Sequence, residues 1–350
     1  MHSAKFIEEI FGNAYFFVYL CAQTTNMKQL SIIVPVYNVE KYVRACMESI
    51  FNQGLDEECY EVIIVNDGTQ DRSMEVIADI IQQHDNITVI NQENQSLSVA
   101  RNNGIAAAKG EYVFMPDSDD LLLENSLKPL LEKALETKVD LVVADFLSMT
   151  DEEIDDFYKK EFQQPELQFK EGTGEQLFLE ELNPYHCYVW RTLYRRDFIV
   201  DNQLSFFPGI RYQDVPFTHE CYIRAKSYIK TNVVLNLYRN WPKAFKIDNS
   251  KSFIIAIAQT WKLRQIEGLT PRVIYKLEED VYTSFRLLIF DTLSFYKTAS
   301  ERNYVIDYLN DNCPTLNFTH GFQQKFFTFM VKRMPHLFIN LYYYYKKVKR

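Results

Sequence analysis

Short apolar runs and amphipathic stretches follow one another along residues 30–146. The apolar runs are rich in β-branched residues, which is typical of strands buried on both faces of a sheet. Between these runs, apolar residues recur at helical spacing. The predicted strands are residues 31–34, 61–65, 87–90, 112–115 and 140–146, and the predicted helices lie near residues 39–50, 74–81, 99–108 and 127–134. We expect the first strand to end at Pro35. The alternation predicts an α/β fold with a mostly parallel sheet that helices cover on both faces.

The regular alternation is lost after residue 146. Residues 151–170 are acidic and irregular, which predicts a surface loop or a short helix, and residues 173–182 have helical spacing. Residues 253–309 predict a set of helices, and two charged residues within their longest apolar run argue against a transmembrane helix. Residues 1–26 are expected to be an extension, with Met27 as the natural start of the protein. An α/β domain over residues 27–245 and a helical C-terminal region over residues 246–350 would follow.

Charge is distributed unevenly along the 350 residues. The net charge of −9 argues against a general nucleic-acid-binding protein. Residues 320–350, however, contain no acidic residue, and seven lysines and arginines interleave there with aromatic residues. The headgroup layer of an anionic membrane favours such a composition, so we predict a peripheral membrane contact through this tail. The alternative is a helix that packs its aromatic side on the α/β domain and leaves its basic side in water.

An acidic turn follows the apolar run 112–115 and Pro116, and reads Asp117-Ser-Asp-Asp120. Three carboxylates in one turn repel one another, and a bound cation would lower this cost. Hard oxygen ligands at the end of a parallel strand suit Mg²⁺ or Mn²⁺, with a diphosphate supplying further ligands. Ligands of parallel sheets bind beyond the carboxyl ends of the strands, which is where this turn falls. The alternative is a solvated turn that caps a helix starting near Glu124.

Four further sequence segments precede this turn. They are Ser31-Ile-Ile-Val-Pro-Val-Tyr-Asn-Val-Glu-Lys-Tyr-Val43, Val65-Asn-Asp-Gly-Thr69, Ala100-Arg-Asn-Asn-Gly104 and Gly110-Glu-Tyr112. In this order and spacing they resemble family 2 glycosyltransferases of the bacterial surface-polysaccharide type, over roughly residues 28–245. The resemblance implies a GT-A fold, a Rossmann-like α/β domain that binds a nucleotide-sugar. A dinucleotide oxidoreductase is disfavoured, because no G-x-G-x-x-G follows the first strand.

The resemblance also implies a set of residues that contact the nucleotide-sugar. They are Pro35, Tyr37, Glu40, Asp67, Arg101, Asp117, Ser118 and Asp119. The ring of Tyr37 can stack on a base, and Asp67 can accept hydrogen bonds from a uracil edge or a ribose hydroxyl. The Arg101 guanidinium suits a phosphate or a carboxylate. The family often has glycine where Ser96 stands.

Each of these positions also has a structural interpretation. Pro35 and Tyr37 could serve only turn and core packing, and Asp67 could serve only the turn before Gly68. Glu40 would suit the dipole of the helix in whose first turn it lies. Arg101 could form a salt bridge with Asp67 or Asp117.

Within the acidic turn, the resemblance implies different roles for the carboxylates. Asp117 would face the ribose or the donor sugar, and Asp119 would bind Mn²⁺ or Mg²⁺. Asp120 would lie behind the metal ligand or on the acceptor side. Trp190 begins a segment, residues 190–199, that resembles the acceptor side of bacterial relatives.

The activity implied by the resemblance is an inverting, metal-dependent transfer of a sugar from a nucleoside-diphosphate sugar. UDP is the expected nucleotide, and the acceptor would be a hydroxyl of a growing glycan or lipid-linked saccharide. Asp214 would be the general base, because it stands in the family's Glu-Asp motif, here Gln213-Asp214. Its alternative role is an N-cap of the helix that follows.

Two other classes of protein remain possible from the sequence. A nucleotidyltransferase has the same need for metal and diphosphate, but it would release pyrophosphate. A non-catalytic family member could act as an assembly partner. The expected location is cytoplasmic and peripheral at the inner face of the cell membrane, without a nucleic-acid partner.

Overall fold

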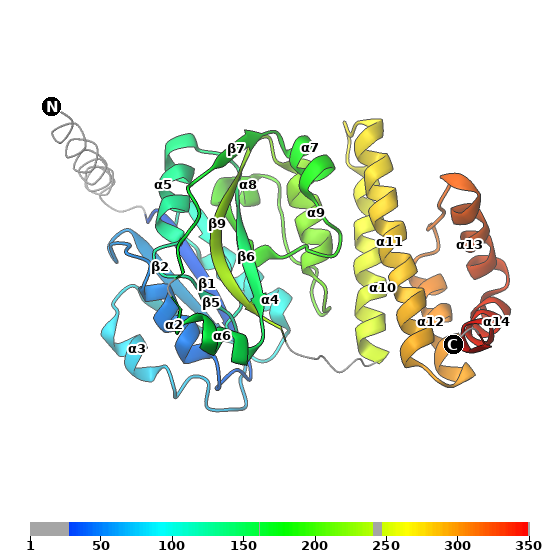
Figure 1. Cartoon of the computed structure of the whole chain (residues 1–350), viewed down its shortest axis with the longest axis horizontal. Coiled ribbons are helices and arrows are strands. Elements are labelled where there is room, and N and C mark those ends of the chain that lie inside the picture. The colour runs from blue at the N-terminus through cyan, green and yellow to red at the C-terminus, as the bar shows by residue number, and fades with distance from the viewer. Residues whose placement is uncertain (1–27, 161, 241–246, 349–350) are drawn as a thin grey trace. The chain divides into compact units, whose positions relative to one another are not determined.

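The computed structural model describes residues 28–160, 162–240 and 247–348 (Figure 1). These residues form two compact units. The first contains the described residues of Met1–Gly172, Val189–Gln203 and Lys226–Trp241, and the second those of Thr173–Tyr188, Leu204–Ala225 and Pro242–Arg350. The predicted extension over residues 1–26 and the predicted boundary at residue 245 lie outside the described residues. Both stay predictions.

A sheet of nine described strands forms the centre of the first unit. The strands are β1 (Leu30–Val36), β2 (Tyr60–Asn66), β3 (Ile87–Asn91), β4 (Tyr112–Phe114), β5 (Leu121–Leu122), β6 (Leu141–Met149), β7 (Phe169–Gly172), β8 (Thr192–Arg195) and β9 (Tyr228–Arg239). Their order is β3-β2-β1-β4-β8-β6-β9-β5, and β7 also pairs with β9. Strands β5, β7 and β8 run against the others, so the sheet is mostly parallel, as predicted.

Helices cover both faces of this sheet. They are α2 (Val43–Phe51), α3 (Ala78–Gln83), α4 (Leu97–Ala107), α5 (Leu127–Thr137), α6 (Asp151–Phe157) and α8 (Arg196–Asp201), with a 3-10 turn at Val189–Arg191. Strand β1 is buried along its whole length. Its residues Ile32 and Val34 share one core with α2 and α5, whereas Ile33 points at Gly104 of α4. The α/β architecture predicted from continuous apolar strands is confirmed.

The register of the parallel strands brings their carboxyl ends to one edge of the sheet. Val36 pairs with Asn66, the last residue of β2, and Ile32 pairs with Phe114, the last residue of β4. Asp67 and the acidic turn directly follow these strand ends. The sheet therefore places both at the edge where ligands of parallel sheets bind.

Pro35 does not end the first strand, so this prediction is wrong. Strand β1 continues to Val36, and Pro35 lies opposite Val65 of β2. The reason is that β4 pairs with β1 only as far as Ile32. Beyond that residue β1 has a free side, where the missing N–H of a proline is tolerated.

The second unit is helical. Its elements are α7 (Gly174–Gln176), a π-helical turn (Leu177–Glu181), α9 (Asp214–Arg224), α10 (Ile247–Lys262), a 3-10 turn (Leu263–Gln265), α11 (Pro271–Phe295), α12 (Ala299–Asn312), α13 (Gly321–Arg333) and α14 (Pro335–Val348). The helices expected over residues 173–182 and 253–309 are thus present. Thr270 caps α11 by accepting a hydrogen bond from the Val273 N–H, and Pro271 fills the first helical position. Among the described residues, no helix combines the length and the apolar character that crossing a bilayer requires.

Candidate functional site

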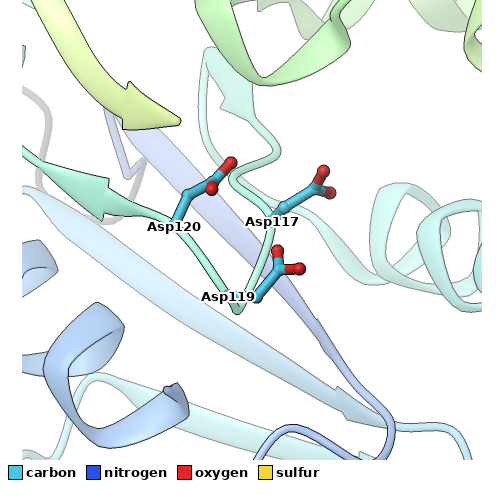
Figure 2. Close-up of side chains that lie close together, drawn as sticks. All are labelled: Asp117, Asp119 and Asp120. Atoms are coloured by element: carbon cyan, nitrogen blue, oxygen red, sulfur yellow. The ribbon is translucent and has the colours of Figure 1, made fainter. Parts of the chain in front are cut away.

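Three carboxylates meet in the turn between β4 and β5. One oxygen each of Asp117, Asp119 and Asp120 lies within 4.8 Å of the others, and Figure 2 shows the side chains projecting to the same side of the turn. The turn does not cap a helix near Glu124, because α5 begins at Leu127 with Ser126 at its N-cap position. That alternative is therefore wrong. Ser118 is buried within the turn.

Asp120 is the most deeply buried of the three carboxylates, with 2% of the residue exposed. Its Oδ1 accepts a hydrogen bond of 2.8 Å from the backbone N–H of Arg239, at the end of β9. Its Oδ2 is buried, and no described residue hydrogen-bonds to it. Burial raises the pKa of Asp120 well above its ordinary value, and the charges of Asp119 and Asp117 raise this pKa further. A buried oxygen without a donor, beside two other hard oxygen ligands, fits a divalent cation.

The negative charge of Asp117 is neutralised by an arginine of the first unit. Arg101 of α4 donates a hydrogen bond to Asp117 and forms a salt bridge with it. The Arg101 side chain is 2% exposed and that of Asp117 is 26% exposed. Of the two salt bridges considered from the sequence, the structure thus contains the one with Asp117. The predicted contact of Arg101 with a nucleotide stays a prediction.

Asp67 organises the loop that leads into α4. Its Oδ1 accepts hydrogen bonds from Gln92 Nε2 at 2.7 Å and from the Gln95 N–H at 2.8 Å. Its Oδ2 accepts one of 3.1 Å from the Ser96 N–H. Ser96 has a φ of 92°, which is a glycine-like conformation. The buried carboxylate of Asp67 therefore fixes a loop geometry that suits glycine at position 96.

The end of β1 and the loop after it carry three of the predicted donor-site residues. Pro35 is buried in β1, whereas Tyr37 is 43% exposed, so its ring is accessible to a ligand. The Glu40 Oε2 accepts a hydrogen bond of 3.0 Å from the Arg72 N–H, and the two side chains form an ion pair at 3.6 Å. Glu40 thus ties this loop to the one that follows β2.

Trp190 is buried in the first unit. Its ring stacks on Tyr238 with centroids 5.3 Å apart and meets Phe146 edge-on at 5.0 Å. In this conformation it packs the end of β9 against β6. Its predicted place on the acceptor side stays a prediction.

Asp214 belongs to the second unit, whereas the acidic turn belongs to the first. It is the first residue of α9, and Gln213 stands at the N-cap position. The alternative that Asp214 is the N-cap of this helix is therefore wrong. A carboxylate in the first turn of a helix is favoured by the helix dipole.

Two basic residues that share the carboxylate of Asp151 were not predicted, and one of them reaches the acidic turn. Arg239 donates its backbone N–H to Asp120, and its guanidinium binds Asp151 of α6 at 2.5 Å. Lys41 binds the same carboxylate at 2.8 Å. The bonded partners are about 90 to 120 residues apart in the chain, and no local pattern connects them. Only the pairing of β9 with β6 and β5 brings Arg239 to the turn.

A Rossmann-like sheet with a carboxylate cluster at its carboxyl edge defines the class of this protein as a GT-A α/β fold. Solved structures have the same fold: Staphylococcus aureus TarS, crystallised as residues 1–349 in complex with UDP-GlcNAc, is similar with a TM-score of 0.66 and 20% identity over 81% of this chain and 80% of that chain.

Residues 31–201 match the family described as glycosyl transferase family 2. EpsJ of Bacillus subtilis, an uncharacterized glycosyltransferase, is 34% identical over 61% of this chain and 62% of its own length. The glycosyltransferase GlyG of Streptococcus pneumoniae is 31% identical over 60% of this chain and 70% of its own. The chain belongs to glycosyl transferase family 2. It spans less than two thirds of the length of EpsJ.

Proposed function

We propose that this protein is an inverting, metal-dependent glycosyltransferase that uses a nucleoside-diphosphate sugar, with UDP as the nucleotide. The acceptor is a hydroxyl of a growing surface glycan or of a lipid-linked saccharide. The observation that carries the proposal is the acidic turn, in which three carboxylates meet at the carboxyl edge of the sheet. The complex of TarS with UDP-GlcNAc supports a UDP-linked donor, and membership of family 2 supports sugar transfer.

The acidic turn fits Mn²⁺ or Mg²⁺, with Asp119 as its ligand. A bound divalent cation would neutralise charge on the departing nucleoside diphosphate. Arg101 holds Asp117 in place, so that this carboxylate can accept hydrogen bonds from the ribose or the donor sugar. Asp67 fixes the loop before α4, and the exposed ring of Tyr37 stacks on the base.

The remaining chemical need is a base for the acceptor hydroxyl. Inversion requires this hydroxyl to attack the anomeric carbon from the face opposite the leaving diphosphate. A hydroxyl is a poor nucleophile at neutral pH, so a carboxylate must take its proton during the attack. We assign this role to Asp214, while Asp120 and Trp190 belong to the acceptor side.

The metal role is tested by Asp119→Ala. We expect this variant to lose Mn²⁺- or Mg²⁺-dependent transfer and the metal-dependent part of UDP binding, measured by calorimetry. Asp156→Ala is a matched control, because Asp156 is an exposed carboxylate of α6. Unchanged transfer by Asp119→Ala, or full wild-type activity in excess chelator, contradicts the metal role. Product analysis separates the classes, because release of pyrophosphate would indicate a nucleotidyltransferase.

The base is tested by Asp214→Asn, which keeps the size of the side chain and removes its basicity. Turnover should fall by about 10²- to 10⁴-fold, while donor binding and melting temperature stay nearly unchanged. Asp201→Asn, at the end of α8, is the control. Near-normal turnover by Asp214→Asn would move the base elsewhere, with Asp120 the next residue to test.

The proposal also places the protein in the cytoplasm, peripheral at the inner face of the cell membrane, through the tail at residues 320–350. A lipid-linked acceptor is found at such a surface. The α/β domain over residues 27–245 would supply catalysis, and the helical region over residues 246–350 would supply this contact.

A further inference from the structure

Helix α13 has the reverse of the usual distribution of side chains. Its buried residues include the polar Gln324 and Thr328, whereas Phe322 is 83% exposed, Phe329 is 54% exposed and Phe326 is 47% exposed. A surface helix normally buries its apolar stripe and exposes its polar one. The sequence-based alternative, in which the aromatic side packs and the basic side faces water, therefore does not describe these three rings.

Helix α14 presents a second apolar stripe outward. Leu337, Leu341, Tyr344 and Val348 are all more than half exposed, and their spacing of three or four residues places them on one side of the helix. Phe338 and Ile339 of the same helix are buried. The helix thus packs through one apolar side and keeps another in contact with solvent. Exposed apolar side chains gathered on one side of a helix indicate an interaction surface.

The positive charge of this surface restricts the kind of partner that it can bind. Among the described residues of α13 and α14 there is no acidic residue, while Lys325, Arg333 and Lys347 are exposed. Two copies of the same surface would bring like charges together, so a symmetric contact between two chains is disfavoured. An anionic partner that also accepts apolar side chains matches both properties.

A groove of about 200 Å³ adjoins the aromatic stripe of α13. Phe322 and Phe326 line it from α13, Tyr342 from α14, and Arg286 and Phe290 from α11. Arg286 lies over the rings of Tyr282 and Phe290, and among the described residues no carboxylate forms a salt bridge with it. Lys346 lies 3.9 Å from the centroid of the Phe290 ring. The groove therefore offers the Arg286 guanidinium to a phosphate and aromatic walls to an acyl chain, and Lys346 lies beside its Phe290 wall.

We infer that the exposed stripes of α13 and α14 dock on an anionic phospholipid bilayer, with Arg286 and Lys346 at the headgroup phosphates. The aromatic rings enter the headgroup layer, and the basic side chains face its negative charge. This inference rests on the proposed peripheral location and names the surface that produces it. It differs from the sequence-based prediction in that specific outward-facing residues, and not the composition of the tail as a whole, carry the binding.

The test is vesicle co-sedimentation of the full chain with phosphatidylglycerol-containing and with pure phosphatidylcholine vesicles. Wild-type protein should bind the anionic vesicles, and salt should weaken this binding. Each partly inserted ring contributes roughly a fivefold gain in partitioning, so Phe322→Ser/Phe326→Ser/Phe329→Ser should bind about 100-fold more weakly. Lys325→Gln/Lys347→Gln should lose roughly 30-fold, since each base near an anionic surface is worth about fivefold.

Tyr185→Ser is the matched control, because Tyr185 is an exposed aromatic residue of the second unit outside the tail. It should bind vesicles as the wild type does, and all variants should keep the wild-type melting temperature and donor turnover in solution. The inference is overturned if the triple variant binds vesicles like the wild type. It is also overturned if the wild type does not bind the anionic vesicles, whether or not it forms a dimer that the triple variant cannot form. Because donor turnover is measured without lipid, loss of vesicle binding is distinguishable from failure of the proposed transferase activity.

Discussion

The salt bridge between Arg101 and Asp117 provides a quantitative test of the site. Arg101→Met keeps a long side chain in the buried space but removes the guanidinium from a pair in which Arg101 is 2% exposed. Removing one partner of a buried ion pair costs about 3–5 kcal/mol. Asp117 remains 26% exposed, so water can hydrate part of its uncompensated charge. We therefore expect the lower end of this range, about 3 kcal/mol.

The assay is urea unfolding followed by circular dichroism, applied to Arg101→Met, to Asp117→Asn and to the double variant. If the two side chains interact as the structure shows, the double variant should lose less stability than the two single losses combined. We expect a coupling free energy of about 1.5–3 kcal/mol, because residues in direct contact fall in this range.

Arg44 and Asp79 form the matched control pair. Their charged atoms are also in contact, at 2.8 Å, but both side chains are about half exposed. Exposed pairs contribute about 0–1 kcal/mol, so the same cycle on Arg44→Met and Asp79→Asn should give a small coupling. If the stability loss of the double variant equals the sum of the losses of Arg101→Met and Asp117→Asn within about 0.5 kcal/mol, the two side chains do not interact. That result would refute the buried ion pair and the role of Arg101 in holding Asp117.

Three further predictions concern positions outside the carboxylates of the site. Ser96→Gly should raise the free energy of unfolding by about 0.5–2 kcal/mol in urea, because it relieves a backbone conformation that suits glycine. Gly104→Ala should lower it by about 1–3 kcal/mol, because a Cβ there would lie 2.2 Å from the Ile33 Cγ2; an unchanged midpoint would contradict this packing. Burial raises the pKa of Asp291 to about 6, so between about pH 4 and 6 the folded state holds a proton on this carboxyl that the unfolded state has released. The free energy of unfolding therefore falls as the pH rises from about 4 through 6. Asp291→Asn should therefore be more stable than the wild type by about 1–3 kcal/mol at pH 8 and nearly equal to it at pH 4, as thermal unfolding at both pH values would show.

The parallel part of the sheet could be predicted from the sequence because its signal is local. Strands β1, β2 and β4 lie in continuous apolar runs, since both of their faces are buried. Once these runs are read as parallel strands, Asp67 and the acidic turn must lie at one edge. The sequence therefore located this part of the site without knowledge of any tertiary contact.

The later strands of the sheet were not predictable in the same way. Strands β8 and β9 lie among segments without regular alternation, and β8 inserts between β4 and β6 although it follows them by many residues in the chain. The hydrogen bond that Asp120 accepts from Arg239 depends on the pairing of β9 with β6 and β5. The outward direction of Phe322 and Phe326 is likewise a tertiary property. Composition showed that the tail is basic and aromatic, but which side of each helix is covered depends on its packing partners.

The cationic side chains near the acidic turn bear on the proposed binding of a divalent cation. Arg101 directs its guanidinium to Asp117. Arg239 directs its guanidinium to Asp151, so that its hydrogen bond to Asp120 comes from its backbone N–H. A backbone dipole compensates a carboxylate less than a full charge does. Lys41 also binds Asp151, which keeps a second cation of the α2 region on that carboxylate. Asp151 thus holds two cationic side chains, and we expect the proposed binding of a divalent cation by the turn to depend on this residue, which is not part of the turn.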